Sequence, residues 1–261
     1  MAFTFTDHDS RNSSVFNSAR KMTSITHVYN ADGSINETPN IWYAAHVNPL
    51  MDEGDNYVKN TRSTRFLGNV YAQAAWKGLL LKSTFSADIK NNRAGQYQDM
   101  TSVSRYQAPN TTAISNNPDH THGYTWQNIL SYNKTLPNDQ ELSVMAGHEM
   151  STSTYESLSL SGTAGKEHYY TNSFYDVSKI LNNGDLSYGS SFTKSGMLSY
   201  FGRLSYSYAG RYLLQGTLRA DASTVLAEGH KWGSFPSASA GWRLSDEAWM
   251  EDLREQIALD N

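Results

Sequence analysis

Five carboxylates could in principle supply the facing acid and base of a glycoside hydrolase, which needs two carboxyl groups with separated pKa values. They are Asp52, Glu53, Asp88, Glu149 and Asp221. Asp88, Glu149 and Asp221 lie in segments that alternate apolar and polar residues, on the polar side, where charged side chains are needed in any case. No Gly-x-Ser-x-Gly nucleophile elbow is present either. The pattern therefore predicts no enzyme, and a β-rich glycoside hydrolase is the weakest alternative.

Two histidines, His120 and His122, have the spacing that places two imidazoles on one face of a strand, as a metal site could use. Pro118 and Gly123 flank the pair and favour a turn instead. No Glu or His stands at motif spacing to supply a third ligand. We therefore expect both histidines to lie in a loop, without a metal.

Cofactor and nucleic-acid chemistry have little support in the sequence. The run Gly162-Thr-Ala-Gly-Lys166 is two residues shorter than a phosphate-binding loop, and Glu167 stands where that loop needs Ser or Thr. The chain has no Cys, which removes thiolate chemistry and cysteine-type zinc sites. Its net charge is −4, and its Lys and Arg residues are scattered rather than clustered. We expect no cofactor, no metal and no nucleic-acid partner.

Aromatic side chains are better candidates for ligand binding. Trp42, Tyr43, Tyr169 and Tyr170 lie in segments that we expect to be outer loops, and a flat ring can stack on the face of a sugar. This interpretation makes the four residues candidate substrate-binding residues. Ordinary packing within the loops is the alternative, and the sequence leaves both open.

The elements that must position these residues are strands. Hydrophobic residues make up 38% and charged residues 18% of a chain with 17 Tyr, a composition that suits alternating strands better than helices. From Leu79 to Lys90 and from Leu198 to Tyr208, apolar and polar residues alternate, which gives each segment one apolar and one polar face. The same pattern predicts strands at 66–76, 124–134, 141–150, 211–221 and 235–244. The chain is therefore predicted to be all-β, with about seven strands.

The connections between these segments alternate short and long. The short ones are 77–78, 135–140 and 209–210, and the long ones are 91–123, 151–197 and 222–234. Transmembrane barrels have this asymmetry, with short periplasmic turns and long extracellular loops. The sequence therefore predicts part of a large antiparallel transmembrane β-barrel.

Aromatic residues support the same architecture. The rings that fall on apolar faces near the short turns are those of Trp76, Tyr132, Tyr208, Tyr212 and Trp242. Amphipathic rings collect at the interface between lipid and water. These five residues are therefore predicted to form one tier facing lipid.

The two ends of the chain differ from its middle. Residues 1–63 alternate poorly and contain Asp32-Gly33, so we expect them to be mainly extracellular loop. Residues 64–261 are expected to form the partial barrel, with a short periplasmic helix near 245–255 that begins with Ser245 as its N-cap. The first residues lack the basic and apolar stretches of an export signal.

Several short motifs between residues 200 and 245 stand out. They are Tyr206-Ser-Tyr208, Arg211-Tyr-Leu-Leu214, Arg219-Ala-Asp221, Lys231-Trp-Gly-Ser-Phe-Pro-Ser237 and Ala240-Gly-Trp-Arg-Leu-Ser245. This block resembles the SusC/RagA branch of the TonB-dependent receptors, and weaker similarity extends the resemblance over roughly residues 65–261. Ala222 and Leu226 depart from the family, which has Gly and an aromatic residue at these positions of a loop tip.

The resemblance implies a barrel of about 22 strands around an N-terminal plug that contacts TonB. No such plug is recognisable in residues 1–261. Because about seven strands leave open edges that lipid does not tolerate, the chain is predicted to be an internal piece of a longer protein.

The resemblance also implies a function and a set of partners. These are TonB-dependent import of oligosaccharides or peptides, a SusD-like surface lipoprotein, the TonB complex reached through the plug, and outer-membrane lipid around the barrel of a Gram-negative bacterium. The main alternative is a soluble β-sandwich that binds glycans. Such a sandwich would bury its apolar faces against each other instead of exposing them to lipid.

Overall fold

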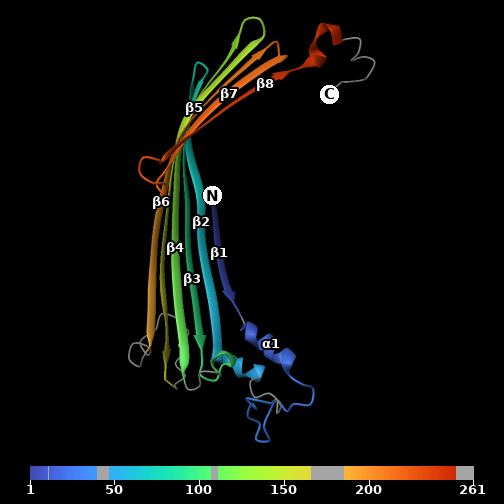
Figure 1. The fold of residues 1–261 in the computed structure, drawn as a ribbon, viewed down its shortest axis with the longest axis vertical. Coiled ribbons are helices and arrows are strands. Elements are labelled where there is room, and N and C mark those ends of the chain that lie inside the picture. Colours follow the sequence, from blue (N-terminus) through green and yellow to red (C-terminus); the bar gives the residue numbers. More distant parts are fainter. Residues whose placement is uncertain (11, 40–46, 107–110, 166–184, 251–261) are drawn as a thin grey trace.

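The computed structural model describes residues 1–10, 12–39, 47–106, 111–165 and 185–250, which form one antiparallel sheet with short helical segments at both ends (Figure 1). The strands lie side by side in chain order. Their bounds are β1 (Ala2–Asp9), β2 (Tyr57–Trp76), β3 (Leu79–Gln98), β4 (Thr112–Leu136), β5 (Gln140–Ala164), β6 (Leu186–Tyr208), β7 (Tyr212–Ser223) and β8 (Trp232–Trp242). The predicted all-β class is confirmed.

Tight turns gather at one end of the sheet, the turn end, which is at the top of Figure 1. Lys77 and Gly78 join β2 to β3 with φ of 46° and 87°, and Ala209 and Gly210 follow β6 with φ of 49° and 64°. Two consecutive positive φ angles give a turn whose twist matches that of the flanking strands. The other ends of β3, β4, β5 and β6 lie at the opposite end of the sheet, the loop end, and the shorter β7 and β8 are connected partway along it.

Most strands extend further toward the loop end than the sequence predicted. Residues 91–98, 112–123, 151–164 and 186–197 were expected to be loop, but they continue β3, β4, β5 and β6. The β4–β5 ladder, for example, is paired from Leu136 with Gln140 as far as Thr112 with Ala164. Both faces of these extensions carry polar residues, so the alternation that identifies a half-buried strand is absent while the backbone pairing persists.

The stretch 1–63 is also more structured than expected. It contains β1, which pairs with the loop-end half of β2, so the described residues hold eight strands rather than seven. β1 is easily missed because only Phe3 and Phe5 supply its alternation. The stretch also holds α1 (Ser13–Lys21) and the 3-10 helices η1 (Pro49–Asp52) and η2 (Gly54–Asn56).

Buried polar residues tie these segments together at the loop end. Asn12 donates hydrogen bonds to Asp52 at 2.7 Å and to Ser104 at 2.7 Å, and the Val103 N–H donates to the other oxygen of Asp52 at 3.0 Å. Ser104 belongs to the 3-10 helix η3 (Val103–Arg105). One carboxylate therefore joins the connection after β1, the end of η1 and the connection between β3 and β4.

At the turn end, the chain after β8 forms two 3-10 helices, η4 (Leu244–Asp246) and η5 (Ala248–Met250), instead of the start of the predicted α-helix. Residues 251–255 of that prediction lie outside the described residues. Ser245 lies within η4 rather than at its N-cap. The N-cap residue of η4 is Arg243, whose side chain makes no capping hydrogen bond.

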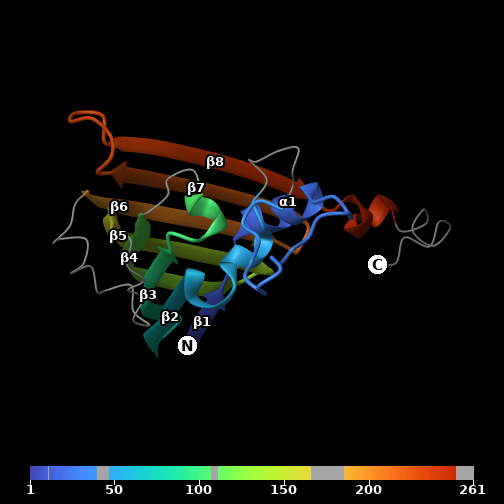
Figure 2. The same cartoon turned by 90° about the horizontal axis from the view of Figure 1, so that it is seen from below.

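The described strands form a single curved layer, and no second sheet of described residues packs against it (Figure 2). The buried hydrophobic side chains are few and lie near the loop end, namely Val47, Met51, Tyr97, Ile114 and Ala164. Large apolar side chains nearer the turn end are exposed, including Trp76 at 67% and Leu218 at 57%. None of the helices among the described residues is long and apolar enough to span a membrane.

Candidate transport surface

The pairing register divides the sheet into two chemically different faces. On β3, Leu79, Leu81 and Phe85 share one face, and Lys82 and Asp88 share the other. Because residues paired in antiparallel strands lie on the same face, the register extends each set across all eight strands. We call the face of Leu79 the apolar face and that of Lys82 the polar face.

The apolar face carries a row of rings near the turn end, the turn-side tier. Its members are the five residues predicted from the sequence, Trp76, Tyr132, Tyr208, Tyr212 and Trp242. Tyr212 stacks between Tyr208 and Trp242, with ring centroids 6.2 Å and 6.3 Å away. The predicted sharing of one face is therefore confirmed by the register.

A second row of rings on the apolar face was not predicted, and we call it the loop-side tier. It comprises Phe85, Tyr124, Trp126, Tyr200 and Trp232. The ring centroids of Phe85 and Tyr124 are 6.1 Å apart, and those of Tyr200 and Trp232 are 6.0 Å apart; both pairs are stacked. Their matching parity with the turn-side tier was the signal in the sequence that could have revealed them.

The distance between the two tiers is largest on β8, since Tyr124 and Tyr132 on β4, like Tyr200 and Tyr208 on β6, stand eight residues apart. Trp232 and Trp242 stand ten residues apart on β8, which corresponds to about 33 Å along a strand. In a barrel whose strands tilt by about 40°, this length spans a height of about 25 Å, that of the apolar band of transmembrane barrels.

Two carboxylates of the polar face are paired with arginines. Arg65 binds Asp88 through two hydrogen bonds of 2.7 Å and 2.6 Å. Arg219 binds Asp221 at 2.8 Å and also donates to Ser199 at 3.1 Å. Asp88 and Asp221 thus each have their own cationic partner, an arrangement of a polar wall rather than of a facing acid and base.

Glu149 also lies on the polar face, where it accepts a hydrogen bond of 2.8 Å from Gln127. The other two carboxylates considered from the sequence lie elsewhere. Asp52 ends η1 in the buried loop-end network, and Glu53 follows it. The structure therefore does not bring the five carboxylates together.

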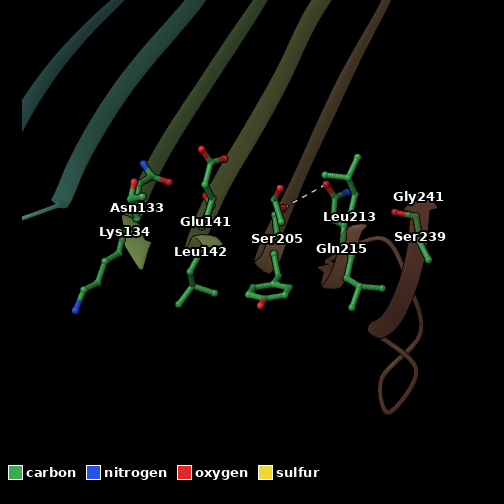
Figure 3. A pocket seen from close by; sticks show the side chains of 15 residues that line it. Asn133, Lys134, Glu141, Leu142, Ser205, Leu213, Gln215, Ser239 and Gly241 are labelled. Carbon is green, nitrogen blue, oxygen red and sulfur yellow. Dashed lines mark hydrogen bonds between the residues drawn. The ribbon is translucent and has the colours of Figure 1, made fainter. Parts of the chain in front are cut away.

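Hollows in the sheet open on the polar face. One of about 680 Å³ lies near the turn end, where Asn133, Glu141 and Ser205 point to one side and Lys134 and Leu142 point to the other (Figure 3). Ser205 donates a hydrogen bond of 3.4 Å to the side-chain oxygen of Gln215 at its floor. Side chains of the polar face thus make up most of the lining of this hollow.

The remaining candidates from the sequence have mixed outcomes. Trp42, Tyr43, Tyr169 and Tyr170 lie outside the described residues. The prediction that His120 and His122 lie in a loop is wrong, because both belong to β4. The pairing with β3 continues through Pro118, whereas the pairing with β5 skips residues 117 and 118, where proline lacks the N–H that a ladder needs. The described residues contain no group of three or more side chains suited to a metal ion.

A compact polar cluster lies at the turn end, where the chain leaves β8. Glu247 accepts hydrogen bonds from the Tyr212 hydroxyl at 2.6 Å, from Trp242 Nε1 at 3.0 Å and from Arg211 at 3.1 Å. The hydrogen bonds from Tyr212 and Trp242, followed by the charge and hydrogen bond of Arg211, hold the pKa of Glu247 below its usual value. The cluster fixes the chain after β8 against the turn-side tier.

Comparison with known proteins connects this sheet to one group of receptors. No protein-family model matches the chain. TonB-dependent receptor P26 of Formosa agariphila is 25% identical over 232 residues, which cover 86% of this chain and 22% of that receptor. TonB-dependent receptor P3 of the same organism is 26% identical over 258 residues, which cover 91% and 23%.

A third relative has a shorter but closer match. TonB-dependent receptor SusC of Bacteroides thetaiotaomicron is 41% identical over 61 residues, which cover 23% of this chain and 6% of that receptor. The chain spans less than a quarter of the length of each of these three curated relatives.

Solved structures share the fold. The RagAB peptide transporter superimposes with a TM-score of 0.69 at 16% identity, over 85% of this chain and 24% of the matched chain. The RagAB peptide importer in its closed-closed state gives a TM-score of 0.68 at 15% identity, over 90% of this chain and 25% of that one. The sheet therefore has the form of part of such a barrel wall.

The curated relatives are receptors and not enzymes by name, which agrees with the separate carboxylates of the polar face. Together with the shared fold, these matches make the chain similar to part of the β-barrel of TonB-dependent receptors such as SusC.

Proposed function

We propose that the chain forms part of the wall of an outer-membrane importer in a Gram-negative bacterium, which takes up oligosaccharides or peptides with energy supplied through TonB. The observation that carries this proposal is the apolar face bounded by two tiers of rings, opposite a polar face with hollows. An apolar band between aromatic girdles suits lipid, and a polar interior suits passage of a water-soluble solute.

We infer three partners for the intact protein. A SusD-like surface lipoprotein would cover the loop end, and the TonB complex would act from the periplasm through a plug. Two comparisons support this inference, since the relative SusC is named a TonB-dependent receptor and the RagAB structures are named a peptide transporter and importer. Outer-membrane lipid would surround the apolar face.

The candidate substrate-binding residues remain part of this proposal. Trp42, Tyr43, Tyr169 and Tyr170 would stack on the substrate from loops at the outer surface. Residues 1–63 would accordingly contribute mainly to the outer, substrate-facing end, and residues 64–261 to the barrel wall.

Tag accessibility on whole cells tests the orientation. One epitope would be inserted at Gly229, between β7 and β8 on the side of these strands that faces the loop end, and another at Gly210, in the turn after β6. We expect antibody to reach the tag at Gly229 and not the tag at Gly210 in cells that produce the full-length receptor. Labelling in the reverse order would contradict the proposed orientation.

The energy source is tested separately. Cells that depend on this receptor would be supplied with pooled oligosaccharides or pooled peptides, with and without a functional TonB. We expect uptake to be lost without TonB, while the receptor remains in the outer membrane. Uptake that persists without TonB would contradict the proposed function.

A further inference from the structure

The polar face is not uniform from one side of the sheet to the other. On β5 its members are the odd-numbered residues from Ser151 to Thr163, and on β6 they are those from Ser187 to Ser199. All of these residues except Gly189 and Met197 carry a hydroxyl group, and none carries a charge. We call this surface the hydroxyl wall.

The neighbouring part of the polar face is strongly charged. At comparable heights β2 carries Lys59 and Arg65, and β3 carries Asp88 and Lys90. The contrast is therefore between strands, because β5 and β6 are paired as far toward the loop end as β2 and β3 are. If the polar face only needed residues that tolerate water, Lys, Asp and Glu would be as acceptable on β5 and β6 as on β2 and β3.

One ring interrupts the hydroxyl groups. Tyr155 lies on the polar face of β5 with 39% of its surface exposed. It is paired with Thr121 of β4 on one side and Thr193 of β6 on the other, and Ser153 and Ser157 are its neighbours on the same face of β5. The ring is thus set among small hydroxylated side chains.

Two hollows of the polar face lie on either side of Tyr155 along β5. The one nearer the turn end measures about 560 Å³ and includes Ser151 and Ser153. The one nearer the loop end measures about 420 Å³ and includes Ser161 and Thr163. Each has a carboxylate at its margin, Asp88 in the first and Asp185 in the second, and Asp88 is bound by Arg65.

We infer that the hydroxyl wall is a contact surface for a neutral, polyhydroxylated solute, and that Tyr155 is its stacking residue. This inference rests on the proposed import function and selects oligosaccharides over charged peptides. A hydroxyl group can exchange a bond to water for a bond to a sugar hydroxyl at little net change in free energy. An anionic solute would lose water against this wall without meeting an opposite charge, and a cationic solute would meet a carboxylate only at the margins of the two hollows, at Asp88 or Asp185.

The ring adds what the hydroxyl groups lack. Hydroxyl groups alone hold a sugar no better than water does, whereas an exposed ring offers an apolar surface to the C–H face of a pyranose. Tyr suits this role because its ring has few rotatable bonds and its hydroxyl can remain hydrated. Tyr155 is the position at which a sliding oligosaccharide would pause between the two hollows.

The test uses the full-length receptor purified with its surface lipoprotein. The complex is incubated with pooled neutral oligosaccharides from several polysaccharide hydrolysates and, separately, with a tryptic digest of casein, and retained molecules are identified by mass spectrometry. We expect retention of neutral oligosaccharides, lowered roughly three- to ten-fold by Tyr155→Ala, the size of one ring contact. Tyr155→Phe should retain them, because it keeps the ring.

Tyr188→Ala is the matched control, since Tyr188 is 80% exposed on the opposite face of β6. Retention of peptides alone, of neither pool, or an equal loss with Tyr155→Ala and Tyr188→Ala would overturn the inference. The proposed function is judged by a different result, the dependence of uptake on TonB in cells. Receptors that import only peptides through TonB would therefore refute the hydroxyl wall and leave the function standing.

Discussion

The two halves of the long strands have the same backbone pairing and different side-chain patterns. Between the two tiers, neighbouring residues such as Thr217 and Leu218 alternate between a polar and an apolar face. Beyond the loop-side tier, β4 and β5 remain paired up to Thr112 and Ala164, although polar residues stand on both faces there. The comparison teaches that pairing is set by backbone hydrogen bonds, whereas alternation reports the medium on each face.

The sharpest way to break this comparison is to place a charge on each face of the same strand. Leu218→Arg puts a cation on the apolar face between the tiers and should destabilise the folded receptor by about 2–4 kcal/mol in lipid. Thr217→Arg should change the stability little, because its guanidinium group remains hydrated on the polar face. The measurement is reversible unfolding of the full-length receptor in lipid vesicles, followed by heat-modifiable gel mobility. Equal destabilisation, or a larger effect of Thr217→Arg, would show that β7 does not face lipid as described.

A second substitution tests close packing on the polar face. A Cβ atom at Gly147 would lie 2.7 Å from the Phe201 ring and 2.8 Å from the backbone oxygen of Asn128. Because the backbone of a central strand cannot move aside, Gly147→Ala should cost about 1–3 kcal/mol in the same unfolding measurement.

Gly216→Ala is the control, since nothing lies within 4 Å of its added Cβ and its φ is not positive. Alanine should be neutral or slightly stabilising there. If the two alanine variants unfold alike, the described contact between β5 and β6 at Gly147 is wrong.

The smallest expected effect concerns the cluster beyond β8. The pKa of Glu247 is lowered from 4.5, so its ionised form stabilises the folded cluster at pH values above 4.5. This stabilisation is lost as the pH falls through the lower pKa of the folded state. We expect the protection of the peptide around 242–250 from hydrogen exchange, relative to the intrinsic exchange rate at each pH, to fall below pH 4.5 in the wild type, and Glu247→Gln to remove most of that dependence on pH.

Asp246→Asn serves as the control, because the Asp246 carboxylate is nearby but contacts Arg243 at 3.6 Å and Ser245 at 3.2 Å rather than the residues that bind Glu247. An unchanged pH profile in Glu247→Gln would show that another group governs the cluster.

The sequence was informative where one face of a strand meets an apolar medium. It predicted the alternation of Leu79–Lys90 and Leu198–Tyr208 and the shared face of the turn-side tier, since apolar and polar residues must then alternate. It missed β1 and the loop-end extensions, because strands that are wet on both faces have no such periodicity.

The transport surface was only partly predictable. Asp88, Glu149 and Asp221 were correctly assigned to one polar face, which parity along each strand is enough to show. The place of Tyr155 among hydroxyl groups depends on the register of β4, β5 and β6, where Thr121 and Thr193 are distant in sequence. The buried partners of Asp52 depend in the same way on tertiary contacts that no local pattern encodes.

The central claim is that alternate residues of each strand between the tiers face lipid and water. Because the chain contains no Cys, single cysteines can be introduced from Tyr212 to Ser223 and spin-labelled in the full-length receptor in lipid vesicles, after removal of any cysteine elsewhere. Electron paramagnetic resonance then compares collision of each label with oxygen, which dissolves in lipid, and with a water-soluble nickel complex. The account predicts a period of two, with oxygen access highest at Leu214 and Leu218 and nickel access highest at Gln215 and Thr217. Uniform access along β7, or the opposite phase, would contradict it.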